Sequence, residues 1–467
     1  MVRIMKSDLH GWPWRPWAAT AAALTLAGCA SFSNDGGFDR VVSLTQERTG
    51  HTPDYQRSVQ QTDLARARID ELLAQPLSAD SAVDIALLNH RGLQARLAEL
   101  GIAEADLVRA GRLRNPGLSF GRLSGGGELE IDRAAIFDVL GLLTLPATQR
   151  MEQSRFEQVQ LRAAADAIQA ANEARRAFFS AVAAQQLLDY SVQVRDAAEA
   201  SGELARQMQN AGNFSKLEQL RERSFHADAI AAHARAQQQA LSERERLLRA
   251  LGLGAAPSAL KLPDRLPDLP TEAMAPQDIE QHALDRRLDI QAAKLQAEAR
   301  ARSLGLSRST RFINVLDVGY QNQGNSRVPR RDGYTVSVEL PLFDFGSTRV
   351  ARAEALYMQS VHHAAEVASH AQSELREAYA AYQAAYGLAR HYRDEVVPLR
   401  KQISDEHLLR YNGMLESVFE LLADTREQVQ GVTGAVEAQR DFWLAQTALQ
   451  SALAGPATSA TSATLAP

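Results

Sequence analysis

The chain contains 467 residues, with 51 Lys and Arg against 56 Asp and Glu, and its formal net charge is −5. This mildly acidic balance argues against a nucleic-acid-binding protein, and the single cysteine excludes a disulfide bond within the chain. Beyond residue 30, no stretch approaches the roughly 18 apolar residues of a membrane-spanning helix, so none is expected there.

The N-terminus has the pattern of a bacterial lipoprotein signal peptide at residues 1–28. Basic residues precede a short apolar stretch, and small residues follow it. Leu26-Ala27-Gly28-Cys29 resembles a lipobox, which implies cleavage after residue 28 and acylation of Cys29. The acylated sulfur would be neither a zinc ligand nor a nucleophile. An ordinary signal peptide that ends near a cysteine is the alternative.

The lipidated N-terminal extension is expected to cover residues 29–78. Ala30, rather than an aspartate, follows the lipidated cysteine. By the same resemblance, this residue favours the outer membrane over the inner membrane.

Two repeats joined by a linker make up the rest of the chain. Each repeat is predicted to run helix, two short strands, very long helix, glycine break and helix. In the first repeat, residues 79–251, these elements are expected at 79–114, 117–123, 128–140, from just past Pro146 to about 211, and, beyond a break at Gly212-Asn213, to about 251.

The linker, residues 252–276, contains five prolines, which break helices and stiffen a connection. In the second repeat, residues 277–454, the elements are expected at 277–308, 312–321, 334–342, 347–412 and, beyond a break at Gly413, to about 454. The tail, residues 455–467, is rich in Ala, Thr, Ser and Pro and is predicted to be disordered.

Particular positions match between the repeats. Phe178 and Tyr379 lie 201 residues apart, and so do Gly212 and Gly413. Chance similarity between two long helices rich in Ala, Gln and Arg is the alternative, but the paired strand insertions argue against it.

The strands of the second repeat alternate between apolar and polar residues. Tyr334, Val336 and Val338 alternate with Thr335 and Ser337, which predicts one apolar face and one polar face. This pattern suits a membrane β-barrel with a watery interior. Because four strands cannot close a pore, several chains would have to combine their strands. A small soluble sheet on a helical stalk is the alternative.

Each very long helix, of about 65 residues, must pack against neighbours along its length. In the second one, a stripe at spacings of three and four residues is predicted to be core. Its members are Leu375, Ala378, Tyr379, Tyr382 and Tyr386. Pro398 is predicted to kink this helix or to lie at a bend.

The order of elements, together with three local sequences, resembles the TolC-like outer-membrane efflux proteins (the outer membrane factor family) of the lipoprotein type. The local sequences are Leu-Pro-Leu-Phe-Asp-Phe-Gly at 340–346, Arg-Tyr-Asn-Gly at 410–413 and Ser-Val-Phe-Glu-Leu-Leu-Ala-Asp at 417–424. The chain departs from the family where one residue, rather than the usual two, separates Tyr411 from Gly413.

The resemblance implies a mainly α fold with a small β part. As a homotrimer, the chain would form a twelve-stranded transmembrane β-barrel in the outer membrane, with four strands from each copy, continued by a long α-helical barrel in the periplasm. It would be the exit duct of a tripartite efflux system and would contact outer-membrane lipid, a periplasmic adaptor (membrane fusion) protein and an inner-membrane efflux pump. No enzymatic activity, cofactor or metal site is expected.

The resemblance also places the periplasmic tip, with its adaptor-docking turns, at two glycine breaks. The residues of these turns are Gly212, Asn213, Gly413 and Met414.

Five residues near these turns are candidates for the gate. Glu420 and Asp424, four apart on one helix face, resemble the acidic gate positions of the family and would form carboxylate rings that attract cations. Glu218 occupies a similar place in the first repeat, and Arg410 and Tyr411 would hold the closed state through contacts between helices. Ordinary solvated helix residues are the alternative for each.

The cargo stays open among copper or other heavy metals, drugs and proteins. The C-terminal part around residues 437–443 resembles branches of the family linked with metal resistance. His362, His363 and His370 share one long helix, but no catalytic constellation accompanies them, so they are expected to be exposed helix residues. The alternative function is a structural coiled-coil lipoprotein that tethers the cell envelope without conducting.

Overall fold

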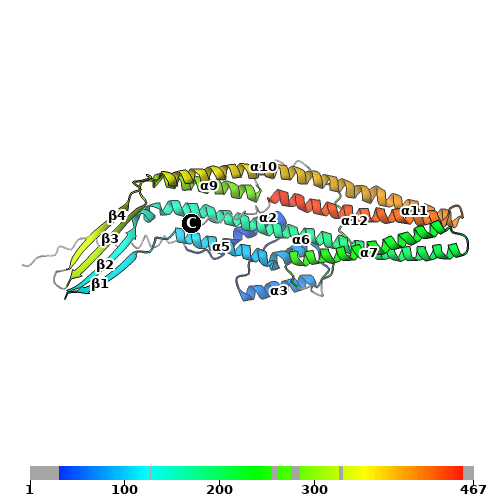
Figure 1. Ribbon diagram of the computed structural model, residues 1–467, viewed down its shortest axis with the longest axis horizontal. Coiled ribbons are helices and arrows are strands. Elements are labelled where there is room, and N and C mark those ends of the chain that lie inside the picture. The colour runs from blue at the N-terminus through cyan, green and yellow to red at the C-terminus, as the bar shows by residue number, and fades with distance from the viewer. Residues whose placement is uncertain are drawn as a thin grey trace, which may run out of the picture. The chain divides into compact units, whose positions relative to one another are not determined.

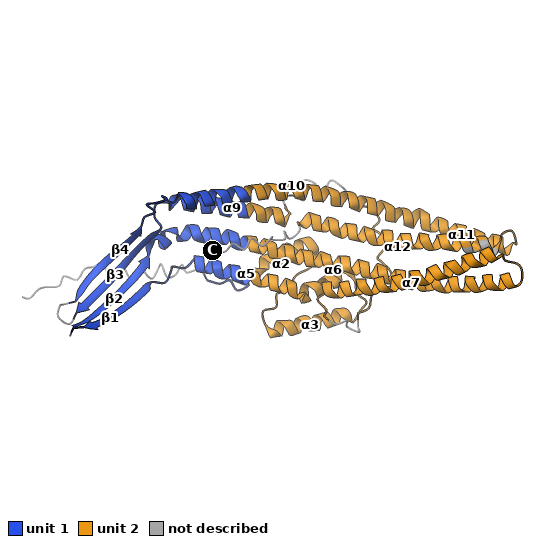
Figure 2. Cartoon of the chain, in the orientation of Figure 1, with its two compact units in different colours: residues 1–36, 101–157, 296–360 blue, residues 37–100, 158–295, 361–467 orange. Residues whose placement is uncertain are grey.

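The computed structural model describes residues 31–126, 128–254, 260–274, 284, 286–325 and 330–455. The predicted signal peptide, Cys29 and the tail beyond residue 455 lie outside the described residues. The chain forms two compact units, each assembled from three segments of the sequence (Figure 2). The first unit comprises residues 1–36, 101–157 and 296–360, and the second comprises residues 37–100, 158–295 and 361–467.

The described residues are mainly helical and include one small sheet, as the sequence predicts (Figure 1). The helices are α2 (Phe38–Thr49), α3 (Val59–Leu73), α4 (Ala79–Asn89), α5 (Arg91–Ala110), α6 (Val139–Asn210), α7 (Lys216–Ala250), α9 (Leu288–Ser309), α10 (Ser347–His391), η2 (Tyr392–Val396), α11 (Val397–Asn412) and α12 (Val418–Ala454). The strands are β1 (Gly117–Gly125), β2 (Glu128–Asp138), β3 (Val315–Asn325) and β4 (Arg331–Glu339). Among the described residues, no helix combines the length and the apolar composition that a membrane span requires.

The four strands form one antiparallel sheet in the order β1-β2-β3-β4 (Figure 1). The central pairing, between β2 and β3, joins the two halves of the sequence. β1 and β4 are the edges, and each has one side that no strand of the described chain pairs. The strands contain 9, 11, 11 and 9 residues, close to the roughly 9–11 that a tilted strand needs to cross a bilayer.

The strands of the second repeat extend further toward their shared hairpin than the predicted ranges 312–321 and 334–342. Asn322 donates a hydrogen bond to Asp332 in this region, and this contact stabilises the additional strand pairing. At its other end, β4 stops before Pro341, because proline has no N–H to donate to a strand ladder.

Two helix boundaries also differ from the prediction. The single helix expected at 79–114 divides into α4 and α5, because His90 is extended and its ring accepts a hydrogen bond from the first turn of α5. α6 begins before Pro146 rather than after it. The Asp138 carboxylate caps α6 by accepting a hydrogen bond at 2.6 Å from a backbone N–H of its first turn.

The second long helix has the predicted end points but contains the π-helical turn η2. Pro398 lies two residues after this turn and cannot donate an α-helical hydrogen bond, so the interruption predicted at Pro398 takes the form of a π turn. Gly434 of α12 lies close against the Tyr392 ring of this turn. A Cβ at position 434 would be 2.7 Å from the Tyr392 hydroxyl.

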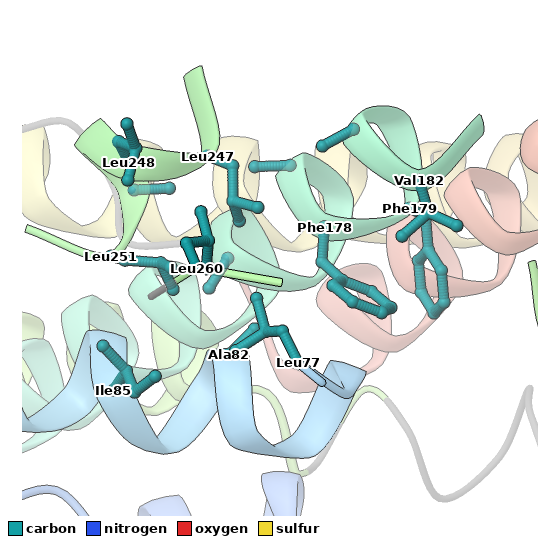
Figure 3. Close-up of a cluster of buried hydrophobic side chains, with 14 of the residues drawn as sticks. Leu77, Ala82, Ile85, Phe178, Phe179, Val182, Leu247, Leu248, Leu251 and Leu260 are labelled. Carbon is teal, nitrogen blue, oxygen red and sulfur yellow. The ribbon is translucent and has the colours of Figure 1, made fainter. Parts of the chain in front are cut away.

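Four clusters of buried apolar residues form among the described residues, and all of them belong to the second unit. One of them joins α4, α6 and α7 through Ile85, Phe178 and Leu247 (Figure 3). The predicted stripe of the second long helix is also core, since Leu375, Tyr382 and Tyr386 are buried.

The described part of the linker is tied to this core by hydrogen bonds. The Tyr386 hydroxyl donates to the Thr271 carbonyl at 3.0 Å, and the Tyr382 hydroxyl accepts from Met274 N at 3.1 Å. Trp443 donates to a carbonyl of the same segment at 3.1 Å. These bonds give the tyrosines of the core stripe a second role, because they hold the segment at 260–274 against α10 and α12.

Candidate functional site

The turn between α6 and α7 closes the first helical hairpin of the second unit. Gly212 is left-handed, with φ +79°, and Asn213 N donates to the Met208 carbonyl at 2.9 Å, which ends α6. Glu218 then accepts a hydrogen bond from Ser215 N at 2.7 Å, and the Ser215 hydroxyl accepts one from Glu218 N at 3.2 Å. This reciprocal pair is a capping box that starts α7.

The turn between α11 and α12 follows the same plan with different residues. Met414, rather than Gly413, takes the left-handed conformation, with φ +53°. The Leu415 N–H donates to the carbonyl of Arg410 at 2.9 Å, as the matching amide does in the first turn. A second capping box starts α12, and in it Glu420 accepts a hydrogen bond from the N-cap backbone at 3.2 Å.

Corresponding positions in the two turns lie 202 residues apart, since Gly212 matches Met414 and Ser215 matches Ser417. The predicted match of Gly212 with Gly413 is therefore wrong by one residue, because Met414 is the structural counterpart of Gly212. The π turn accounts for the difference, because a π turn inserts one extra residue into a helix and η2 precedes the second turn.

The predicted gate residues Glu218, which is half-buried, and Glu420, which is exposed, both close capping boxes. The hydrogen bonds from the backbone and then from the side chain of Ser215 lower the pKa of Glu218. The spacing Ser-x-x-Glu at 215–218 and 417–420 is a sequence signal for this cap. It explains the recurrence of the glutamates independently of any gate.

Asp424 has a different environment from Glu420, although both lie on α12. Asp424 is buried, with 5% of its surface exposed, whereas Glu420 is exposed. One Asp424 carboxylate oxygen has no hydrogen-bond partner among the described residues. The two acids therefore differ in their surroundings within a single chain.

Among the described residues, the side chains of Arg410 and Tyr411 form no ion pair or hydrogen bond to another helix, so their predicted closing role stays a prediction. Arg410 pairs with Glu406, one turn earlier on α11, at 3.0 Å. Tyr411 is 40% exposed.

A buried ion pair that sequence reasoning missed connects the two hairpins instead. Arg426 of α12 lies 2.5 Å from Glu222 of α7, and Glu222 is 1% exposed. The Ser201 hydroxyl of α6 donates to the second Glu222 oxygen at 2.6 Å. Because Arg426 and Glu222 are 204 residues apart in the chain, no local spacing could have revealed the pair.

A second missed contact lies within the second hairpin. His407 of α11 is 2.9 Å from Glu416, which precedes the N-cap of α12. At a spacing of 202, the first hairpin has Ala205 and Phe214 at these positions and cannot form the same pair.

The sheet of the first unit has two chemically different faces, which follow from its register. The apolar face carries Leu118, Phe120, Arg122, Leu129, Ile131, Arg133, Phe137, Leu316, Val318, Tyr320, Asn322, Asp332, Tyr334, Val336 and Val338. The polar face carries Ser119, Glu128, Glu130, Asp132, Asp138, Asp317, Gln321, Gln323, Arg331, Thr335, Ser337 and Glu339, with Leu123, Ile136 and Val315 as its large apolar members. Leu118 and Tyr334 are 81% and 84% exposed, so the apolar face is uncovered in one chain.

No protein-family model matches the chain, and the comparison with curated proteins found no match. Solved structures, however, share its fold. CusC, studied in relation to folding and transmembrane channel formation, has a TM-score of 0.69 at 17% identity, covering 86% of this chain and 99% of its own. The outer-membrane channel OprN has a TM-score of 0.65 at 19% identity, covering 88% and 96%. The Neisseria gonorrhoeae MtrE outer membrane channel, in its open state, has a TM-score of 0.68 at 15% identity, covering 81% and 89%.

These likenesses establish the fold. The chain has the TolC-like fold of outer-membrane channels, mainly α with a small antiparallel sheet, as the sequence resemblance predicts.

Proposed function

We propose that three copies of the chain form the outer-membrane exit duct of a tripartite efflux system. The sheet is the observation that supports this proposal most, because it has one exposed apolar face, one polar face and two edges that no strand of the described chain pairs. An apolar face is stable against lipid, but unpaired strand edges are not. Closure therefore needs strands from further copies, and three copies would supply twelve strands around a water-filled lumen.

The charge of the polar face supports a duct that favours cations. Six carboxylates lie on this face of the described strands, against the single guanidinium of Arg331. They belong to Glu128, Glu130, Asp132, Asp138, Asp317 and Glu339. Rings of such carboxylates attract cations in a narrow pore, so cationic cargo, metal ions among it, suits this lumen best.

The two hairpin turns are the proposed docking surface for the periplasmic adaptor, through which an inner-membrane pump would deliver the cargo. Gly212 and Asn213 are exposed in the first turn. Met414 and Leu415 are 94% and 82% exposed in the second. Exposed apolar side chains at a turn favour contact with a partner over contact with water.

The gate is proposed to depend on the link between the two hairpins of each chain. Glu222 and Arg426 hold α7 and α12 together, and release of this pair would let the second hairpin move outward. Glu420 and Asp424 remain the candidates for carboxylate rings near the turn. Replacement of both by Ala is expected to lower the preference for cations over anions, measured as the reversal potential in a salt gradient. An unchanged reversal potential would remove both residues from the pore.

Lipid on Cys29 is proposed as a second membrane anchor. Ser33 lies four residues after Cys29, and both its backbone N–H and its hydroxyl donate to Glu104 of α5 at 2.6 Å. Glu104 belongs to the first unit, which also contains the sheet. Replacement of Cys29 by Ala distinguishes duct from tether, since a duct would partly remain in the membrane fraction and a tether would be released.

Cysteine cross-linking of the sheet edges tests the trimer. Cys29 is the only natural cysteine, so paired cysteines at Ser119 of β1 and Thr335 of β4 have little background. Gly333 and Ser337, on the same face of β4, are tested in place of Thr335 so that three registers between copies are sampled. At least one pair is expected to give a covalent ladder that ends at the trimer. A ladder that ends at the dimer, continues past the trimer or never forms with any pair would contradict the proposal.

The matched control places cysteines at Ala134 and Gln321, which face each other in the β2–β3 pairing. This pair is expected to form a disulfide within one chain and to give no ladder.

A further inference from the structure

Two arginines lie on the mainly apolar face of the sheet. Arg122 of β1 is directly opposite Ile131 of β2, and Arg133 lies two residues further along β2 on the same face. Such diagonal neighbours on antiparallel strands have Cα atoms about 7–8 Å apart. Both side chains are exposed, and neither has an ion-pair partner among the described residues.

The acids of the sheet do not neutralise this pair. The apolar face of the described strands has one carboxylate, Asp332, which accepts hydrogen bonds from Tyr320 at 3.0 Å and Asn322 at 2.5 Å. Asn322 also separates Asp332 from Arg133, because it is the direct partner of each in the register. Two arginines at neighbouring positions of the sheet therefore share a surface, and their guanidinium groups repel each other on close approach unless an anion lies between them.

The position of the arginines along the strands identifies the depth at which that anion would lie. Tyr320 and Tyr334 face each other on the apolar face, and Arg133 lies in the next same-face row toward the β1–β2 and β3–β4 hairpins. Tyrosines mark the boundary between lipid tails and headgroups. An arginine costs roughly 2–4 kcal/mol on a lipid-facing strand at the bilayer midplane but about 0–1 kcal/mol at the interface. The headgroup layer is thus the depth at which both residues are tolerated.

The β1–β2 and β3–β4 hairpins lie at the strand ends opposite those that lead into α5, α6, α9 and α10. If the chain is an outer-membrane duct with its helices in the periplasm, as proposed above, these two β-hairpins face the cell exterior. We infer that Arg122 and Arg133 form a binding site for a phosphate group of the phosphorylated glycolipid, lipopolysaccharide, that occupies the outer leaflet. Guanidinium groups bind phosphate through paired hydrogen bonds, and two of them can hold one phosphate from both sides.

This inference rests on the proposed function, and the test uses the full-length lipidated protein reconstituted in lipid nanodiscs. Purified lipid A is the probe, and binding is measured by native mass spectrometry and by titration. Combined replacement of Arg122 and Arg133 by Gln is expected to weaken lipid A binding by roughly tenfold or more, because hydrogen bonds to charged groups are the strong ones. The double Lys variant, which keeps both charges but loses the paired geometry, is expected to bind with intermediate affinity.

Arg331→Gln is the matched control, since Arg331 lies on the polar face of the same sheet, in the β3–β4 hairpin. It is expected to leave lipid A binding unchanged. Dephosphorylated lipid A and phosphatidylglycerol are expected to bind the wild-type protein as weakly as lipid A binds the double Gln variant. Millimolar inorganic phosphate is expected not to displace lipid A.

Equal lipid A binding by the wild type and the double Gln variant would overturn the site, and so would equal loss in Arg331→Gln. Equal binding of phosphatidylglycerol or dephosphorylated lipid A, or displacement by free phosphate, would overturn the assignment to lipopolysaccharide. The same samples are recorded in planar bilayers. A conducting protein without selective lipid A binding contradicts this inference alone, whereas a protein that never conducts contradicts the proposed function.

Discussion

The two helical hairpins have the same hydrogen-bond pattern at their turns but differ in the residues that form and stabilise these turns. The first turn places a glycine in the left-handed position, and the second places Met414 there. The second hairpin also contains the π turn η2 and the His407–Glu416 pair, for which the first has no counterpart. In both hairpins, a capping box of serine and glutamate starts the second helix. The repeats thus preserve the hydrogen bonds that start and stop helices and diverge in strain and charge.

This difference indicates which hairpin is the moving part. A left-handed non-glycine residue costs roughly 1–2 kcal/mol, and π turns occur frequently at functional sites. The ion pair Glu222–Arg426 joins the strained hairpin to the relaxed one. We therefore propose that the first hairpin is the fixed frame and that the second moves when this pair is released.

Loss of the ion pair is expected to have the largest effect. Arg426→Ala leaves Glu222 buried without its partner, which is expected to lower the free energy of unfolding by about 3 kcal/mol per chain, since Arg426 is itself partly exposed. Denaturant unfolding followed by circular dichroism measures this change. Arg410→Ala, which removes an exposed pair within one helix, is the control and is expected to cost less than about 0.5 kcal/mol. Equal effects of the two variants would refute the link.

The π turn is expected to be the next most sensitive feature. Gly434→Ala would place a Cβ 2.7 Å from the Tyr392 hydroxyl, and the resulting overpacking is expected to lower the free energy of unfolding by about 1–2 kcal/mol. Gly431→Ala on the same helix meets only the flexible Arg400 side chain, at 3.3 Å. This control is expected to be neutral or slightly stabilising because alanine favours helix. A stabilising Gly434→Ala would show that η2 does not pack as described.

Exchange of the left-handed residues tests whether the two turns differ in backbone strain, because the two substitutions are expected to change the free energy of unfolding in opposite directions. Gly212→Met is expected to destabilise the protein by about 1 kcal/mol, and Met414→Gly to stabilise it by up to about 1 kcal/mol. Nothing lies within 4 Å of a Cβ at position 212, so backbone strain alone is at issue there. The same unfolding measurement detects both changes. Two effects of the same sign would mean that the turns do not differ in strain.

Acid is expected to destabilise the first hairpin, and this effect is expected to be smaller than those of the substitutions above. Hydrogen bonds from Arg206 and then Gln207 lower the pKa of Glu203 to about 2, and those from Ser215 lower the pKa of Glu218. Because these folded-state values are depressed, the stabilisation is present above the unfolded value of about 4.3 and is lost as pH falls through the folded values. Hydrogen exchange in α6 and α7 should therefore accelerate, relative to its intrinsic rate, below about pH 4.3.

Glu218→Gln is expected to reduce that acid sensitivity at the start of α7. If the variant and the wild type respond identically to acid, the cap does not contribute to the pH dependence.

Much of the fold could be predicted because it rests on local patterns. The ends of α6, α7, α11 and α12 follow glycines and periodicity, and the two sheet faces follow the alternation in residues 334–340. The predicted start of α6, just past Pro146, is wrong because the Asp138 side chain caps the helix earlier and Pro146 does not mark its boundary.

The candidate site was harder to predict, because its strongest contacts join distant parts of the chain. Glu222 and Arg426 meet only after both hairpins form. The glutamates at 218 and 420 are predicted gate residues, and their Ser-x-x-Glu spacing also indicates helix caps, which the structure contains. The register of the repeat shifted by one residue at a π turn, which leaves no mark in the spacing of apolar residues alone.

Single-channel recording in planar bilayers tests the central claim most directly. The wild-type protein is expected to insert as a trimer and to conduct in small steps, and Arg426→Ala is expected to conduct in larger steps or to stay open longer, because its second hairpins are released. A wild-type protein that never conducts, although it is trimeric and folded, would contradict the duct. Identical conductance and open times in the two proteins would contradict the link between the hairpins as its gate.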